Sequence, residues 1–115
     1  MLHTFDQFAR IQLALEDLAG ALESSQKAIA LYPGEPKYYT VAGDAARRQG
    51  DVPQSLQFLR QGVANTDSND LRLTFARRLI EAGQFAEARA VLKDVLTRDS
   101  ANAAAADLLK QIEGR

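Results

Sequence analysis

A sequence pattern about as long as one helix occurs three times along the chain. It constrains the fold more than any other feature of the sequence. It is visible when three segments are aligned: LAGALESSQKAIALYP, VPQSLQFLRQGVANTD and FAEARAVLKDVLTRDS, which begin at Leu18, Val52 and Phe85. The starts are 34 and then 33 residues apart, and each segment has a small residue three places after an apolar one. A period in this range predicts a solenoid, in which each helical hairpin buries its apolar face against its neighbours.

Helical periodicity accounts for nearly every segment of the chain. Tyr39, Ala42, Gly43 and Ala46 fall at positions i, i+3, i+4 and i+7, which lie on one face of a helix. Prolines and glycines, as in the run from 33 to 36, interrupt the pattern between helices, and the short connections predict antiparallel neighbours. The predicted helices span about residues 3–15, 18–31, 36–49, 52–64, 69–82, 85–98 and 102–113.

The recurring pattern resembles the tetratricopeptide repeat, whose signature runs W-x₂-L-G-x₂-Y, then A-x₃-F, then P. The first aromatic position holds Phe5 and Tyr39 in the first two repeats, but Arg72 in the third. The most diagnostic matches are small residues at positions where the two helices of a hairpin must approach closely. They are Ala9, Gly43 and Ala76 on the first helices, with Ala21, Ser55 and Ala88 on the second helices.

This resemblance implies an all-α fold, a right-handed superhelical solenoid of antiparallel helix pairs. Residues 1–115 are expected to form a single domain. Its three repeats would span about residues 2–35, 36–68 and 69–101, followed by a helix at 102–113. That last helix has one apolar stripe, so it either caps the third repeat or begins a fourth.

Composition argues against several other classes of protein. The 14 Lys and Arg residues nearly balance the 15 Asp and Glu residues, so no overall charge favours nucleic acid or anionic lipid. The absence of cysteine excludes disulfides, zinc-thiolate sites and thiol catalysis. No stretch approaches the roughly 18 apolar residues of a membrane span, and the N-terminus lacks the features of a signal peptide. We expect a cytoplasmic protein if the chain is complete, and a periplasmic one if it is a piece of an exported bacterial protein.

The sequence predicts no enzymatic, cofactor or metal site. His3 is the sole histidine, and Asp6 lies on the same helix face, but two ligands do not close a metal site. No Ser-His-Asp arrangement, phosphate-binding loop or G-x-G-x-x-G motif is present. Tyr32, Tyr38 and Tyr39 cluster at a turn between repeats, where core filling by Tyr39 and partial burial of the other two are favoured over stacking on bases.

The resemblance also implies a concave groove, because in this family the first helix of each pair lines the inner face. Arginine and lysine outnumber acidic residues on the corresponding positions, and Leu73 and Ile80 are apolar there. Guanidinium groups beside apolar side chains suit a peptide with carboxylates and hydrophobic anchors. The expected partner-binding residues are Arg10, Arg47, Arg48, Leu73, Arg77 and Ile80. The alternative is that the arginines pair internally with Asp44, Asp70 or Glu81, and that the two apolar residues pack between repeats.

These observations predict a non-enzymatic scaffold that binds a peptide or helix of another protein, with neither nucleic acid nor membrane insertion involved. Co-chaperones of the family grip a C-terminal carboxylate through a Lys and Asn pair on the first helix. Asp6 and Arg10 occupy those positions here, so this clamp is absent. The alternative function is a segment of a longer repeat array, acting as a structural scaffold in a bacterial envelope secretion or exopolysaccharide-export assembly and self-associating through its terminal helices.

Overall fold

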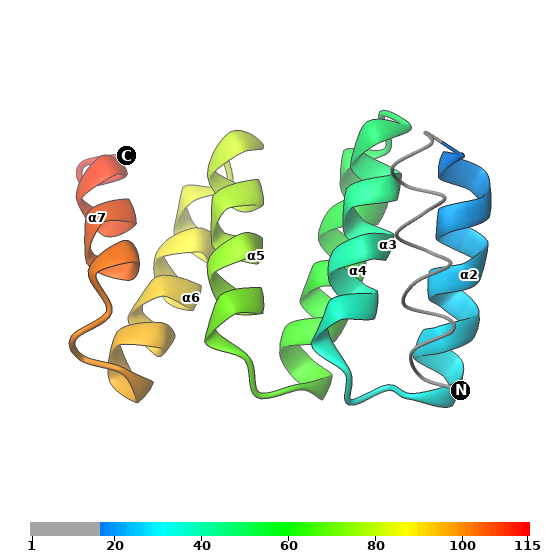
Figure 1. Ribbon diagram of the computed structural model, residues 1–115. Helices are drawn as coiled ribbons and strands as arrows, with labels where there is room; N and C mark the ends of the chain where they lie inside the picture. Colours follow the sequence, from blue (N-terminus) through cyan, green and yellow to red (C-terminus); the bar gives the residue numbers. More distant parts are fainter. Residues whose placement is uncertain (1–16) are drawn as a thin grey trace. The chain divides into compact units, whose positions relative to one another are not determined.

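The computed structural model describes residues 17–115, and this part of the chain is all-helical, without strands (Figure 1). The helices are α2 (Leu18–Leu31), α3 (Pro36–Arg48), α4 (Val52–Asn65), α5 (Asn69–Glu81), α6 (Phe85–Arg98) and α7 (Ala103–Gln111). They confirm the predicted all-α class, and each observed end lies within two residues of the predicted one. The helix expected at 3–15 lies outside the described residues. None of the described helices is long and apolar enough to cross a membrane.

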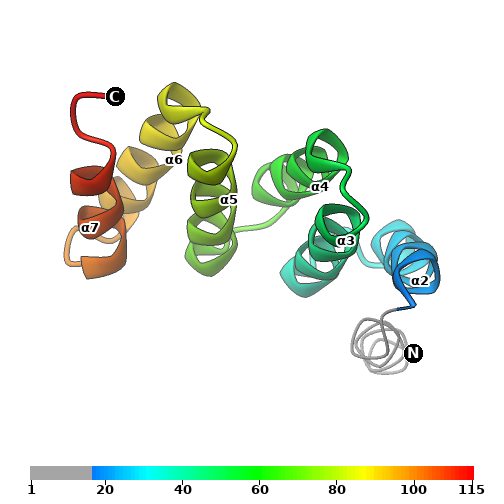
Figure 2. The same cartoon turned by 90° about the horizontal axis from the view of Figure 1, so that it is seen from above.

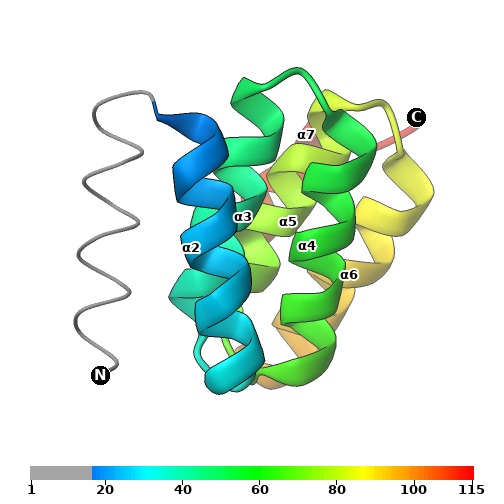
Figure 3. The same ribbon diagram turned by 90° about the vertical axis from the view of Figure 1, so that its right-hand side faces the viewer.

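The chain forms two compact units, Met1–Asp67 and Ser68–Arg115. In the first unit α3 contacts both α2 and α4, and consecutive helices run antiparallel (Figure 2 and Figure 3). In the second unit α5 and α6 form an antiparallel pair, and α7 contacts both of them. The boundary between the units falls next to the expected boundary between the second and third repeats, and the single domain over 1–115 stays a prediction.

Polar side chains at the helix starts explain where several helices begin. Asp17, Asp51, Ser68 and Asn102 each accept a hydrogen bond from a backbone N–H three residues further on, at 3.1, 3.1, 3.2 and 3.0 Å. Each bond satisfies a donor that the helix itself cannot. Gly50, immediately before one of these caps, has a φ of 86°, a left-handed conformation that favours glycine. Gly50 therefore ends α3 and Asp51 caps the start of α4 at this turn.

Two alanines of α3 lie at the centre of the first unit. Ala42 and Ala46 are fully buried and cluster with Phe58 of α4, while Leu22 and Ile29 of α2 pack against the same cluster. Short side chains on the middle helix allow the large side chains of both neighbours to reach it. Burial of a side chain such as that of Phe58 contributes roughly 1.5–3 kcal/mol to folding.

The helices α3 and α4 approach closely at Gly43. A Cβ atom at this position would lie 3.0 Å from Cγ of Leu59 and 3.5 Å from the backbone oxygen of Ser55. The Ser55 hydroxyl donates a hydrogen bond of 2.7 Å to the carbonyl oxygen of Gly43. The small residues at these two positions therefore permit α3 and α4 to pack closely, as the repeat pattern predicts.

The tyrosines at the turn between α2 and α3 are structural. Tyr39 is fully buried, and its hydroxyl donates to the carbonyl of Pro33 at 2.6 Å and accepts from Nδ2 of Asn65 at 3.3 Å. Tyr38 is also fully buried, so the prediction of partial burial is wrong for this residue. Its ring lies against that of Tyr32 at the end of α2, with 6.4 Å between the ring centroids, which shields it from solvent.

The core of the second unit contains large aliphatic and aromatic side chains from α5 and α6, and α7 completes it. Its buried members include Leu71, Phe75, Leu79, Leu92, Val95 and Ile112. The small residues of this helix pair, Ala76 and Ala88, are both fully buried. This unit thus has the same division into large packing residues and small contact residues as the first.

Arg72 is an exception in this core, because it stands where the preceding repeat carries Tyr39. Its side chain is only 4% exposed; Nη1 donates to Oδ1 of Asn69 at 2.9 Å, and Nε lies 3.5 Å from Oδ2 of Asp94. Asp94 belongs to α6 and also lies 3.3 Å from Nε of Arg98. A buried guanidinium requires such partners to offset its desolvation. The third repeat therefore replaces aromatic packing with an ion pair between α5 and α6.

We predict that Gly43→Val lowers the free energy of unfolding by about 1–3 kcal/mol, because the new side chain collides with Leu59 and displaces α4. Gly34→Val is the control, since a Cβ at Gly34 meets no atom within 4 Å. Urea denaturation followed by far-UV circular dichroism measures both variants. Equal stability of the two variants would contradict close helix contact at Gly43.

We predict that Asp94→Ala lowers the free energy of unfolding by about 1–3 kcal/mol, a range below that of fully buried pairs because Asp94 is 46% exposed. Adding Arg72→Met should restore part of the lost stability, because it removes the buried positive charge that Asp94 neutralises in the wild-type protein. The same urea titration tests this. A double variant no more stable than Asp94→Ala would show that an uncompensated charge is not the cause.

Candidate functional site

After Pro36, the accessible residues of α3 form one strip along the helix. The strip consists of Lys37, Thr40, Asp44, Arg47 and Arg48, at spacings of three and four residues. Its members are half-buried or exposed, whereas the intervening residues 38, 39, 41–43, 45 and 46 are buried. This α3 strip carries three basic side chains and one acidic side chain, so it is a basic surface.

Asp44 contacts both arginines of the α3 strip. Nη2 of Arg47 lies 2.9 Å from Oδ1 of Asp44, and Nη2 of Arg48 lies 3.3 Å from Oδ2. The internal pairing considered as an alternative therefore occurs for these two arginines. The Arg47 and Arg48 side chains are still 37% and 43% exposed. Because a guanidinium has five N–H groups, the contact with Asp44 alone does not saturate either one.

The position of these arginines also has a local structural reason. Arg47 and Arg48 occupy the last turn of α3. Cations are favoured there because they complement the partial negative charge at the helix C-terminus. A ligand carboxylate at this end of α3 would be bound by the guanidinium groups and not by the helix dipole.

The helix α5 carries the other three predicted contacts within the described chain. Leu73 is only 7% exposed, so it belongs to the core and offers a partner little area. Ile80 is half-buried and Arg77 is exposed on the same helix. Arg78, and not Arg77, pairs with Glu81, at 2.6 Å. Within the described residues, Arg77 makes no ion pair or side-chain hydrogen bond.

Some predicted features lie outside the described residues. These are Arg10, which completes the predicted contact set, and the pair formed by His3 and Asp6. Among residues 17–115, no group of three or more histidine, cysteine, aspartate or glutamate side chains is arranged to hold a metal ion.

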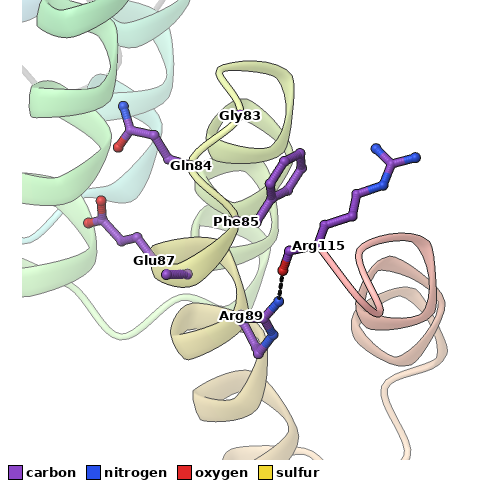
Figure 4. Close-up of a pocket in the computed structure, with 7 residues that line it drawn as sticks. Gly83, Gln84, Phe85, Glu87, Arg89 and Arg115 are labelled. Atoms are coloured by element: carbon purple, nitrogen blue, oxygen red, sulfur yellow. Dashed lines mark hydrogen bonds between the residues drawn. The ribbon is translucent and has the colours of Figure 1, made fainter.

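The second unit contains a pocket of about 490 Å³ at the start of α6 (Figure 4). It is lined by Gly83, Gln84, Phe85, Ala86, Glu87, Arg89 and Arg115. Arg89 donates a hydrogen bond to the backbone oxygen of Arg115, whose guanidinium carbon lies 5.7 Å from the ring centroid of Phe85. The lining residues include no hydroxyl, thiol or imidazole group.

Comparisons with known proteins identify the repeat. Two sequence models of the tetratricopeptide repeat match the chain, one over residues 46–112 and the other over residues 7–70. No match is found among curated proteins.

Two solved structures share the fold over nearly the whole chain. The OM64 TPR domain from Arabidopsis is similar with a TM-score of 0.75 and 16% identity, covering 97% of this chain and 93% of that one. The first TPR domain of Spaghetti (RPAP3), bound to the HSP90 peptide SRMEEVD, is similar with a TM-score of 0.74 and 16% identity, covering 97% of this chain and 90% of that one.

Proposed function

Because the chain belongs to the tetratricopeptide repeat family, we propose that it is a non-enzymatic scaffold that binds a segment of another protein. The observation that carries this proposal is the α3 strip, a row of basic and partly exposed side chains on the first helix of a repeat. Helices of this class line the binding groove in the family that the sequence resembles.

The charges of the strip favour a partner segment that contains carboxylates. Guanidinium groups bind carboxylates through paired, charge-assisted hydrogen bonds. On α5, the exposed Arg77 lies three residues from the half-buried Ile80, which places a cation beside an apolar side chain. A peptide or helix with both acidic and apolar residues fits this chemistry.

One of the similar structures lends support to this kind of ligand. The Spaghetti domain is bound to SRMEEVD, a peptide with acidic residues beside methionine and valine. The contacts would differ here, because Asp6, Asp70 and Thr74 stand where the co-chaperone clamp has basic residues or asparagine. The general chemistry of an acidic and apolar peptide is therefore proposed, and the HSP90 peptide itself is not.

Each predicted contact residue has a defined role in the proposal. Arg10, Arg47, Arg48 and Arg77 supply charge-assisted contacts with the partner, and Ile80 supplies an apolar one. Leu73 is retained as a neighbouring apolar residue, but its burial makes Ile80 the main apolar contact on α5. Exposed ion pairs contribute only about 0.2–1 kcal/mol each, so binding requires several of them together and weakens as salt rises.

We predict that charge reversal at both strip arginines, R47E with R48E, abolishes peptide binding. Peptides are first selected from a random phage-displayed library on the immobilised wild-type chain, and should be enriched in Asp, Glu and apolar residues. Affinity for the selected peptides should fall at least about tenfold in the double variant, because attraction is replaced by repulsion. Fluorescence anisotropy measures affinity, and circular dichroism should report unchanged helicity.

The matched control reverses two exposed lysines on second helices, Lys27→Glu with Lys93→Glu, which produces the same change in net charge. Binding by this control should stay close to that of the wild-type chain. An unchanged affinity after reversal at Arg47 and Arg48, or an equal loss in the control, would remove the α3 strip from the binding site. A selection that yields no peptide would contradict the scaffold proposal itself.

A further inference from the structure

The α3 strip contains one acidic residue among its basic ones, and its position is informative. We propose that Asp44 is a positioning residue, which holds the guanidinium groups of Arg47 and Arg48 together so that both contact a single carboxylate of the partner. This inference rests on the proposed function of the strip and defines the ligand chemistry more narrowly: one carboxylate at this end of α3.

The geometry of the three side chains is that of a bridge. Asp44 uses Oδ1 for Arg47, at 2.9 Å, and Oδ2 for Arg48, at 3.3 Å. Two neighbouring guanidinium groups repel one another, and a shared counter-charge offsets that repulsion. Fixing them also removes rotamer freedom before any ligand arrives, so less entropy is lost on binding.

The Asp44 side chain is more deeply buried than the side chains of Arg47 and Arg48. Asp44 is 21% exposed, whereas Arg47 and Arg48 are 37% and 43% exposed. In addition, Nε of Arg47 is buried and makes no hydrogen bond within the described chain. A buried donor without a partner is uncommon and costs free energy. The part of the Arg47 side chain around Nε is therefore held by packing, while another part of the side chain stays accessible.

Charge sets the ligand that this cluster accepts. Two guanidinium groups and one carboxylate carry a net charge of +1, which one ligand carboxylate neutralises. A second ligand carboxylate at the same place would approach Asp44 and be repelled. The carboxylate could belong to a glutamate or aspartate side chain or to the C-terminus of a peptide, since both present the same group.

A purely structural role for Asp44 makes different predictions. Ion pairs at i, i+3 and i, i+4 stabilise a helix slightly, and this effect alone would alter stability without linking the two arginines to one ligand group. Removal of the acidic charge alone would strengthen the attraction of an acidic peptide. If Asp44 positions the two arginines, its removal should instead weaken peptide affinity. The peptide would then dissociate faster, and this effect would outweigh its faster association.

The test is a double-mutant cycle on the full chain. The probe is a synthetic peptide with acetylated and amidated ends, in which one glutamate lies between two leucines in an alanine and glutamine background. Affinities are measured for Arg47→Ala, Arg48→Ala and both together, first in the wild-type chain and then with Asp44→Ala. In the wild-type chain the two effects should be coupled by about three- to tenfold, because one carboxylate is shared.

In the Asp44→Ala background, affinity for the probe should fall by about fivefold, and the coupling between the arginines should disappear. Asp44→Asn, which keeps the shape and removes the charge, should act in the same direction and serves if Asp44→Ala does not fold. Glu23→Ala is the matched control, because it removes an acidic charge from an exposed i, i+4 pair with Lys27 on α2. That control should leave the coupling unchanged.

A second pair of probes distinguishes the two sources of the carboxylate. One carries glutamine in place of the glutamate and a free C-terminus, and the other carries glutamine with an amidated C-terminus. Coupling with the first of these probes would assign the cluster to a terminal carboxylate, and coupling only with the glutamate probe would assign it to a side chain. Binding that is the same for all three probes would overturn the inference.

The remaining outcomes separate this inference from the proposed function. If selected peptides bind and R47E with R48E abolishes binding, but Asp44→Ala leaves affinity equal or tighter or leaves the coupling intact, only the positioning role is overturned. If the wild-type chain binds neither the probes nor any selected peptide, the proposed function fails and the positioning role fails with it.

Discussion

The close packing of paired helices at small residues is the constraint on which the rest of the structure depends. At Gly43 the missing side chain leaves room for the Leu59 side chain of α4, and the Ser55 hydroxyl donates a hydrogen bond to the Gly43 carbonyl oxygen. Such packing fixes the rotation of α3 about its own axis, because only the face of α3 with small residues can approach α4 this closely. Once that rotation is set, the alanines face the core and the opposite edge faces solvent. The α3 strip is the consequence of this choice and not an independent feature.

Much of this fold could be predicted from the sequence, because its local signals act over a few residues. Asp51 and Ser68 cap helices that begin where the pattern places them, and Gly50 provides the left-handed turn that ends the preceding helix. These signals depend on backbone geometry and on neighbouring N–H groups alone. Helix bounds were therefore predictable to within two residues over the described chain.

The side chains of the candidate site were less predictable, because their surroundings come from other helices or from a choice of rotamer. Their spacing in the sequence places Leu73 and Ile80 on the same face of α5, yet Leu73 is buried and Ile80 is half-buried. Spacing indicated that Asp44 could reach an arginine, but not that it would use one oxygen for Arg47 and the other for Arg48. Periodicity locates a residue on a face, and the packing of neighbouring helices decides how far its side chain emerges.

The ion pair of Arg72 and Asp94 has a consequence for how a chain of similar hairpins assembles. Repeats with matching apolar patterns can in principle pair a first helix with the wrong second helix. The positions equivalent to Asp94 in the two earlier segments are Lys27 and Gln61, neither of which can neutralise a buried guanidinium. At this position, α5 therefore finds a counter-charge on α6 and not on α2 or α4. A buried arginine that departs from the repeat pattern in this way disfavours pairing of α5 with the wrong second helix during folding. The free-energy cost of burying its charge without a partner makes the correct pairing of helices more specific.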